Sequence, residues 1–391
     1  MSREAVIVDA VRTPVGKRGG QLRDWHPVDL LAHTIAYLVD RTGIDAARLA
    51  DVIVGCALQR GEQSGNVARN AVLGAGLPVS LPGTTLDRQC GSGQQAVHFA
   101  AQAIKSGEYD FAIGAGVESM TRVDLGPLFV PGGGRGDWYG TRALARFDGD
   151  LPAQGPSVEL VAKKWGFTRQ QLDAYSVQSH RRAAAASDAG HFASALVPLD
   201  GTDKNGNTVA LSRDEGIRFD IDPERVAGLQ PVFSPDGLIT AGNASQMSDG
   251  AAALLLAERG AAEAAGLRPR ARIVSMAVAA DDPVLQFTAI LPASQRALEQ
   301  AGLTIGDIDL VEVNEAFSPV PLLWREEFGY PEEQLNVNGG SIAIGHPLGS
   351  TGGRLMTQLV NELERRQARY GLLTICEGGG MANASIIERL D

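Results

Sequence analysis

The chain has 391 residues, of which 44% are apolar and 21% charged, and its formal net charge is −11. This composition is typical of a globular protein with sizeable cores. The acidic balance disfavours non-specific nucleic-acid binding, which depends on Lys and Arg. Three cysteines without a short metal-type spacing argue against both a disulfide framework and a cysteine-based zinc site, so we expect no metal.

Three segments of the chain bear on its location. The N-terminal residues contain no long apolar stretch of the signal-peptide kind. The apolar run AAALLLA at 251–257 is far too short to span a bilayer, and the final residues IIERLD are not a peroxisomal signal. We therefore expect a cytoplasmic protein with no membrane insertion.

Strand-like runs alternate with helical patterns from the N-terminus, which predicts α/β architecture. The first run is AVIVDA at 5–10, and LADVIVGCAL at 49–58 is the next. Cys56 lies inside that second run, and we interpret it as a core residue because free cysteine is often buried.

The stretch LDRQCGSGQQAV at 86–97 places Cys90 where a loop becomes a helix. A helix N-terminus can lower the pKa of a thiol and so create a nucleophile. The alternative interpretation is a cysteine that only fills space in the core. The strand-like run YDFAIGAG follows at 109–116.

Residues 120–244 are rich in glycine, proline and charge, and we interpret them as an inserted loop domain. Two helices are predicted inside this insertion, SVELVAKKWG at 157–166 and TRQQLDAYSVQSHRRAAAA at 168–186.

The two ends of the chain resemble each other. ARIVSM at 271–276 repeats AVIVDA, and IDLVEVNEAF at 308–317 repeats the run that contains Cys56. His346 precedes a helix and then the strand YGLLTICEGGG, as Cys90 precedes a helix and a strand. The shared order predicts a duplicated domain. Cys90 and His346 would then occupy equivalent helix N-termini and form an activated nucleophile pair.

The duplication sets the predicted domain boundaries. An N-terminal half covers 1–119 and is completed by about 245–268, and a C-terminal half covers 269–391. The inserted loop domain covers 120–244.

Three further residues stand out in the second half. Asn314 falls at a strand end, although a plain turn residue is an equal alternative. His346 lies on a glycine-rich turn, where an imidazole has little packing purpose and a catalytic role is favoured. Cys376 ends a strand and opens a glycine run, and it could also be a buried structural cysteine. The other five histidines are assigned no role.

Taken in order, five motifs resemble those of the thiolases over essentially the whole chain. They are RQCGSGQQA, TAGNASQMSDGAAALLL, VNEAF, NGGSIAIGHPLGSTGGR and CEGGGMANA. The resemblance implies the thiolase fold, which has two αβαβα halves related by a pseudo-two-fold axis and an inserted loop domain.

The resemblance also implies catalytic roles. Cys90 would carry the acyl group as a thioester, and His346 would deprotonate Cys90 and later the CoA thiol. Cys376 would move the proton at the α-carbon of the acetyl unit. One oxyanion hole would join His346 with a water held by Asn314, and the other would join the amides of Cys90 and Gly378.

Coenzyme A enters as co-substrate, with no prosthetic group expected. The resemblance places Ser245 near the pantetheine and Arg218 near the nucleotide end. It places Ala316 and Phe317 along the pantetheine tunnel. It also implies a homodimer or homotetramer, and β-oxidation enzymes as possible partners.

Short-chain biosynthetic thiolases usually carry a His-Met-Gly pattern where this chain reads Ala153-Gln154-Gly155. That departure, together with the sequences of the motifs RQCGSGQQA and CEGGGMANA, favours a degradative 3-ketoacyl-CoA thiolase. Its acyl chains would be medium, long or bulky, with steroid-type chains included. The alternatives are an acetyl-CoA C-acetyltransferase working in the condensing direction and, more remotely, an inactive acyl-CoA-binding scaffold. Many thiolases have a glycine where this chain has Ala382, and we expect little effect from this change.

Overall fold

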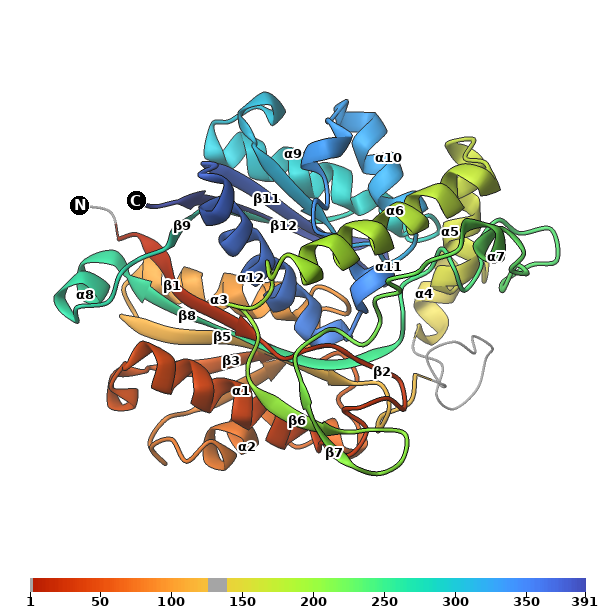
Figure 1. Ribbon diagram of the computed structural model, residues 1–391. Coiled ribbons are helices and arrows are strands. Elements are labelled where there is room, and N and C mark those ends of the chain that lie inside the picture. The colour runs from red at the N-terminus through yellow and green to blue at the C-terminus, as the bar shows by residue number, and fades with distance from the viewer. Residues whose placement is uncertain (1–2, 126–138) are drawn as a thin grey trace.

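The computed structural model describes residues 3–125 and 139–391 (Figure 1). The glycine-rich part of the predicted insertion at 131–138 lies outside the described residues.

One large sheet runs through the described part of the chain, in the order β10-β11-β12-β9-β1-β8-β5-β3-β4, with β2 paired to β8. Its strands are β1 (Ala5–Arg12), β2 (Gly16–Lys17), β3 (Asp51–Gly55), β4 (Gly83–Leu86), β5 (Phe111–Ser119), β8 (Ser248–Glu258), β9 (Ala271–Ala280), β10 (Leu310–Val313), β11 (Tyr370–Glu377) and β12 (Met381–Arg389).

The strand order repeats itself about the seam between β1 and β9. Outward from the seam, the N-terminal side runs β1, β8, β5, β3 and the C-terminal side runs β9, β12, β11, β10. On each side the last two of these strands pair in parallel and the others pair antiparallel. The predicted α/β fold with two similar halves is therefore confirmed, whereas the boundaries of the domains stay a prediction.

Helices form layers around the sheet. Figure 1 shows α3 and α12 in the middle of the molecule, between the strands of the two halves, with α1 and α2 on one outer side and α9 and α10 on the other. The helices of this core are α1 (Pro27–Thr42), α2 (Val67–Gly74), α3 (Ser92–Ser106), α8 (Arg259–Ala264), α9 (Ile290–Ala301), α10 (Pro319–Phe328), α11 (Ser341–Ile344) and α12 (Leu348–Arg366).

The apolar run at 251–257 forms the middle of β8, which lies between β1 and β5. Every residue of this run is buried, because the strand is covered on both faces. Cys56 is fully buried in the same core, as expected. No helix within residues 3–125 and 139–391 is long and apolar enough to cross a membrane.

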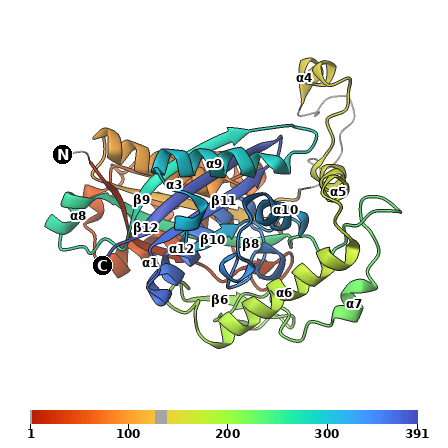
Figure 2. The same cartoon turned by 90° about the horizontal axis from the view of Figure 1, so that it is seen from above.

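Both helices predicted in the insertion are present, as α5 (Gln154–Lys164) and α6 (Arg169–Asp188). Thr168 caps the N-terminus of α6 with a capping box. The Thr168 hydroxyl accepts a hydrogen bond from the backbone N–H of Gln171, and the Gln171 side chain accepts one from the backbone N–H of Thr168. The remaining elements are α4 (Gly140–Arg146), α7 (Pro223–Ala227) and the hairpin of β6 (Leu199–Thr202) and β7 (Thr208–Leu211). Figure 2 shows α4, α5 and α7 together at one end of the molecule.

Candidate active site

Cys90 lies two residues before the first turn of α3 and is only 4% exposed. The glycines on either side of the turn let other backbone segments approach closely. A Cβ atom on Gly91 would stand 1.8 Å from the carboxyl oxygen Oε1 of Glu377. The thiol is therefore enclosed by the C-terminal half of the chain, although its own residue belongs to the N-terminal half.

The first turns of α3 and α12 pack directly against each other. A Cβ atom on Gly93 would lie 2.4 Å from the carbonyl oxygen of Gly349, so only glycine fits at this crossing. Each of these glycines lies three residues after a predicted catalytic residue, Cys90 or His346. The two helix N-termini thus bring the predicted nucleophile and base to one region, as the repeat predicted.

The ring of His346 is held by its own helix. Its Nδ1 lies 2.7 Å from the hydroxyl of Thr351, and that hydroxyl donates to the carbonyl of Pro347 at 2.9 Å. Because the hydroxyl proton is already committed, Nδ1 must be the donor to Thr351, and Nε2 keeps its lone pair. Burial, followed by the charge of Arg354, lowers the pKa of His346 to about 3. The imidazole is therefore neutral at physiological pH and can accept a proton.

Asn314 follows the end of β10 and is fully buried. Its Nδ2 lies 3.5 Å from Nε2 of His346. Its Oδ1 accepts a hydrogen bond of 2.6 Å from the hydroxyl of Ser341, which in turn accepts one from Arg354. These contacts orient the Asn314 amide with its NH₂ group toward the imidazole.

Cys376 lies at the end of β11 and is 1% exposed. Burial raises its pKa well above the ordinary value, and the nearby Cys90 and Glu377 raise it further. The electrostatic interaction with Cys90 indicates that the two thiols are neighbours.

The expectation that the helix N-terminus lowers the pKa of Cys90 is wrong for the free enzyme. Burial and then the carboxyl of Glu377 raise the pKa of this thiol to about 12, outweighing a hydrogen bond from the side chain of Gln154. A thiol of this kind needs a base to become a nucleophile. The neutral imidazole of His346 is suited to that task.

Gly378 forms the turn between β11 and β12, next to the cysteine loop. A Cβ atom on Gly378 would lie 3.2 Å from Oε1 of Gln89, the residue before Cys90. The turn at Gly378 therefore lies against the side chain of the residue that precedes Cys90.

A cleft of about 520 Å³ lies beside this region. Three cationic side chains line it, Lys17, Arg218 and Arg225, together with the acidic side chains of Asp220 and Asp222. Gln246 also lines the cleft, and its carbonyl accepts the backbone N–H of His346 at 3.0 Å. The cleft therefore borders the catalytic region. The backbone N–H of Arg218 donates to Nδ1 of His180, which gives a structural role to a histidine that was assigned none.

Ser245 lies between this cleft and the residues predicted to line the pantetheine tunnel. Its backbone N–H donates to the carbonyl of Ala316 at 2.9 Å, and Ala244 forms a β-bridge with Phe317. The ring of Phe317 packs edge-on against Phe287, with centroids 5.6 Å apart. Of the four residues predicted for CoA, Arg218 lines the cleft. The other three, Ser245, Ala316 and Phe317, lie together next to Gln246, which also lines the cleft.

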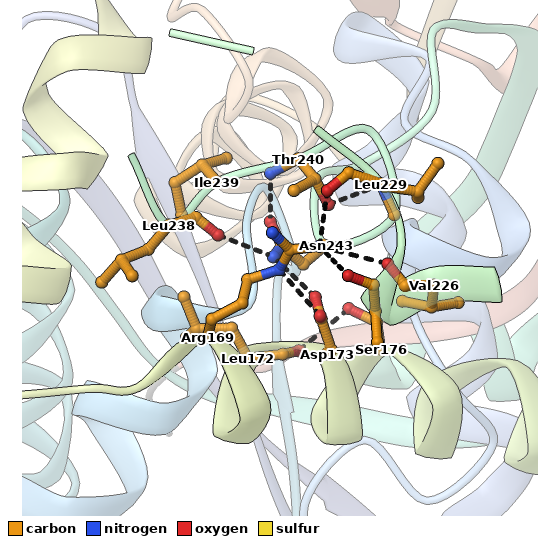
Figure 3. A network of polar contacts seen from close by, with 12 residues as sticks. Arg169, Leu172, Asp173, Ser176, Val226, Leu229, Leu238, Ile239, Thr240 and Asn243 are labelled. Atoms are coloured by element: carbon orange, nitrogen blue, oxygen red, sulfur yellow. Dashed lines mark hydrogen bonds and ion pairs between the residues drawn. The ribbon is translucent and has the colours of Figure 1, made fainter. Parts of the chain in front are cut away.

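The wall of the cleft around 226–229 is fixed to α6 by a polar network (Figure 3). The guanidinium of Arg169 donates to the carbonyls of Val226, Ala227 and Leu229. Its Nε donates to Asp173, which also accepts a bond from Asn243. Because α6 is a long and well-capped helix, this network gives the cleft a rigid wall.

Within the described residues, no group of three or more His, Cys, Asp or Glu side chains could hold a metal ion.

Several residues that organise the site were not predicted from the sequence, namely Thr351, Ser341, Arg354, Glu377 and Gln286. Thr351 and Ser341 lie inside the motif around His346, so their position near the imidazole was a usable signal. Glu377 lies inside the motif CEGGGMANA, next to Cys376, although no local pattern reveals its contact with the loop of Cys90. Gln286 lies outside the five motifs and reaches the site by accepting the backbone N–H of Gly379.

Comparison with known proteins agrees with this geometry. The family profile "Thiolase, N-terminal domain" matches residues 5–260, and "Thiolase, C-terminal domain" matches residues 267–389. A steroid 3-ketoacyl-CoA thiolase of Mycobacterium tuberculosis is 47% identical, over 99% of this chain and 94% of the relative. A 3-oxoadipyl-CoA/3-oxo-5,6-dehydrosuberyl-CoA thiolase of Escherichia coli is 43% identical, over 99% of this chain and 100% of the relative. The crystal structure of the Bacillus anthracis acetyl-CoA acetyltransferase superposes with a TM-score of 0.90 at 35% identity, covering 100% of this chain and 99% of that one.

Proposed function

Because the chain belongs to the thiolase family of acyltransferases, we propose that it is a degradative 3-ketoacyl-CoA thiolase. It would cleave a 3-ketoacyl-CoA with CoA, giving acetyl-CoA and an acyl-CoA shortened by two carbons. The acyl chain would be medium, long or bulky, with steroid-type chains included.

The observation that carries this proposal is the state of His346. Its Nδ1–H is committed to Thr351, and its neutral Nε2 faces the amide of Asn314. In the first step Nε2 takes the proton of the Cys90 thiol, and the sulfur attacks the 3-keto carbonyl. The bond between C2 and C3 then breaks, its electron pair forms the enolate of acetyl-CoA, and the thiol of Cys376 gives that enolate its proton. The imidazolium of His346 then gives its proton to the Cys376 thiolate, so both groups begin the second step in their original states.

In the second step His346 takes the proton of the incoming CoA thiol. The CoA sulfur attacks the thioester on Cys90, the bond to Cys90 breaks, and Cys90 leaves as a thiolate that regains a proton. Negative charge develops on a different oxygen in each half-reaction. The two proposed oxyanion holes, one at Asn314 and His346 and the other at the amides of Cys90 and Gly378, match this need, and removing one such donor typically costs ~3–4 kcal/mol of activation free energy.

The three cationic side chains of the cleft support CoA as the co-substrate. Lys17, Arg218 and Arg225 would face the phosphates of its nucleotide end, since these groups carry the negative charge of CoA. Ser245, Ala316 and Phe317 would then contact the pantetheine as it passes toward Cys90.

Two observations favour a large acyl group. The 47% identical relative is named as a steroid 3-ketoacyl-CoA thiolase. Ala153 and Gln154 also replace the His-Met pair that short-chain biosynthetic thiolases usually carry. The alternative, acetyl-CoA acetyltransferase in the condensing direction, is favoured by the structural match to the Bacillus anthracis enzyme. We further propose a cytoplasmic homodimer or homotetramer that works beside other β-oxidation enzymes.

The test is a thiolysis assay on the purified protein and on Cys90→Ala. The substrates run from acetoacetyl-CoA through medium- and long-chain 3-ketoacyl-CoAs to a steroid side-chain 3-ketoacyl-CoA. We expect the highest kcat/KM on a long or bulky substrate, with no turnover by Cys90→Ala. A preference for acetoacetyl-CoA would instead favour the acetyltransferase. CoA binding without turnover of any substrate would favour the inactive scaffold.

A further inference from the structure

Gln286 is a buried glutamine in an unusual backbone conformation. It is 2% exposed and has φ 55° and ψ −52°, in a region that residues with a side chain rarely adopt. It directly precedes the short 3₁₀ helix Phe287–Ala289. A strained conformation at a buried position persists only where the surroundings hold it in place, and such positions concentrate at functional sites.

The amide of Gln286 bridges two segments that are far apart in the sequence. Its Nε2 donates to the carbonyl of Pro152 at 2.7 Å and to the hydroxyl of Ser157 at 3.0 Å. Its Oε1 accepts the backbone N–H of Gly379 at 3.1 Å. One side chain therefore joins the first turn of α5 to the turn that contains Gly378.

Each of these two segments also adjoins Cys90. Gln154 is the first residue of α5, and its side chain lies near enough to the Cys90 thiol to lower the pKa of that thiol. The turn at Gly378 packs against Gln89, the residue before Cys90. Cys90 thus has an amide side chain on one side and the proposed oxyanion turn on the other.

The first turn of α5 has little room to move. A Cβ atom on Gly155 would stand only 2.2 Å from the ring of Phe233, so the helix packs here through a glycine backbone. The position of Gln154 therefore depends on this packing on one side and on the hydrogen bonds of Gln286 on the other.

We propose that Gln286 is a positioning residue that holds the first turn of α5 and the oxyanion turn at a fixed separation across Cys90, and that Gln154 is the residue that stabilises the Cys90 thiolate. The inference rests on the proposed thiolase function. Gln154 acts in the step in which the CoA sulfur attacks the thioester. The bond from the acyl carbon to Cys90 breaks, the electron pair stays on the sulfur, and the Gln154 amide donates a hydrogen bond to that thiolate.

The experiment compares Gln154→Met, Gln286→Met, the double variant and a control, Gln358→Met. Gln358 is also buried and also donates from its Nε2, to Glu312 and to the carbonyl of Gly339, so it matches the size and burial of the change. Two quantities are measured for each protein. The first is the rate of Cys90 alkylation by iodoacetamide between pH 7 and 10, followed by peptide mass mapping. The second is kcat and the KM for CoA in thiolysis.

We expect Gln154→Met and Gln286→Met each to slow Cys90 alkylation about tenfold, as a one-unit rise of the thiol pKa requires. The kcat should fall in parallel, while the KM for CoA stays within about twofold, because the nucleotide cleft is not touched. The double variant should be little worse than either single variant, since both act through the same hydrogen bond. The control should lose thermal stability without any change in the alkylation profile.

Unchanged alkylation in Gln286→Met, or a double variant whose effects multiply, would overturn the inference. If Gln286→Met does not fold, Ser157→Ala removes one of its hydrogen-bond partners and should shift the alkylation rate in the same direction. Failure of the wild-type protein to turn over any 3-ketoacyl-CoA would count against the proposed function alone. The alkylation of Cys90 would still test the positioning role.

Discussion

The hydroxyl of Thr351 donates its single proton to the carbonyl of Pro347, 2.9 Å away, and so can only accept from Nδ1 of His346. A base that must take protons through Nε2 depends on this arrangement, because the other tautomer would present an N–H to the thiol. Thr351 does not touch the reacting atoms. Its effect passes through the imidazole.

We predict that Thr351→Val lowers kcat about 10- to 100-fold, because the imidazole loses the acceptor that fixes its tautomer and its orientation. Thr357→Val is the matched control, since the Thr357 hydroxyl makes the same kind of bond to a carbonyl four residues earlier in α12. The measurement is steady-state thiolysis together with the melting temperature of both variants. Equal losses of kcat in the two variants would show that Thr351 has no special role.

At the scale of elements, the site exists because α3 and α12 begin in contact. A Cβ atom on Gly352 would stand 2.1 Å from the backbone nitrogen of Gln94, and backbone cannot move aside as a side chain can. Glycine at this crossing is therefore required for the two helix N-termini to present Cys90 and His346 together.

We predict that Gly352→Ala reduces kcat at least about tenfold and destabilises the protein by about 1–3 kcal/mol, as overpacking does in other cores. Gly260→Ala in α8 is the control, because its new methyl group would meet only the side-chain carboxylate of Glu258, at 3.1 Å, and no backbone atom. Activity and urea-induced unfolding are measured for both. Wild-type activity in Gly352→Ala would mean that α3 and α12 can move apart at this crossing without loss of activity. The crossing would then not be what positions the catalytic pair.

The elements and the central pair of residues could be predicted from the sequence, because both leave local patterns. The helix predicted at 168–186 is found as α6, Arg169–Asp188, and the repeat correctly placed Cys90 and His346 before two equivalent helices. The pKa of Cys90 could not be predicted from its place in the chain. It depends on burial and on Glu377, which comes from a strand nearly three hundred positions away.

Gln286 illustrates the same limit. Nothing in the run DDPVLQFTAI marks it, and its partners Pro152, Ser157 and Gly379 come from two other segments of the chain. Local patterns indicate which helices and strands form and which side chains could act as nucleophile, base or hydrogen-bond donor. They do not reveal which side chains connect one element to another.

At the scale of the whole molecule, the two halves are joined by polar contacts under α3 as well as by the seam of the sheet. Nε2 of His98, on α3, lies 2.6 Å from the hydroxyl of Ser385 on β12, and Gln94 donates to the same hydroxyl at 2.7 Å. Both contacts cross from the N-terminal to the C-terminal half and share the Ser385 hydroxyl. Because His98 is buried, its protonation would place a charge without a partner carboxylate at this contact between the halves.

Burial, followed by the charges of Arg88 and Lys105, lowers the pKa of His98 to about 3, whereas the unfolded side chain titrates near 6.5. Between these values the unfolded chain binds one more proton than the folded one, so stability due to this group is complete above pH 6.5 and is lost as the pH falls. From pH 7 to pH 5 the loss of stability is about 2 kcal/mol.

The variant His98→Gln tests this prediction, because glutamine cannot take up the proton. The variant should be less stable than the wild type at pH 7, and the difference in the free energy of unfolding should shrink by about 2 kcal/mol between pH 7 and pH 5. Urea unfolding followed by tryptophan fluorescence at pH 7, 6 and 5 measures the difference, in which the other titrating groups cancel. Two parallel stability curves would show that His98 is protonated equally in both states and does not couple the halves to pH.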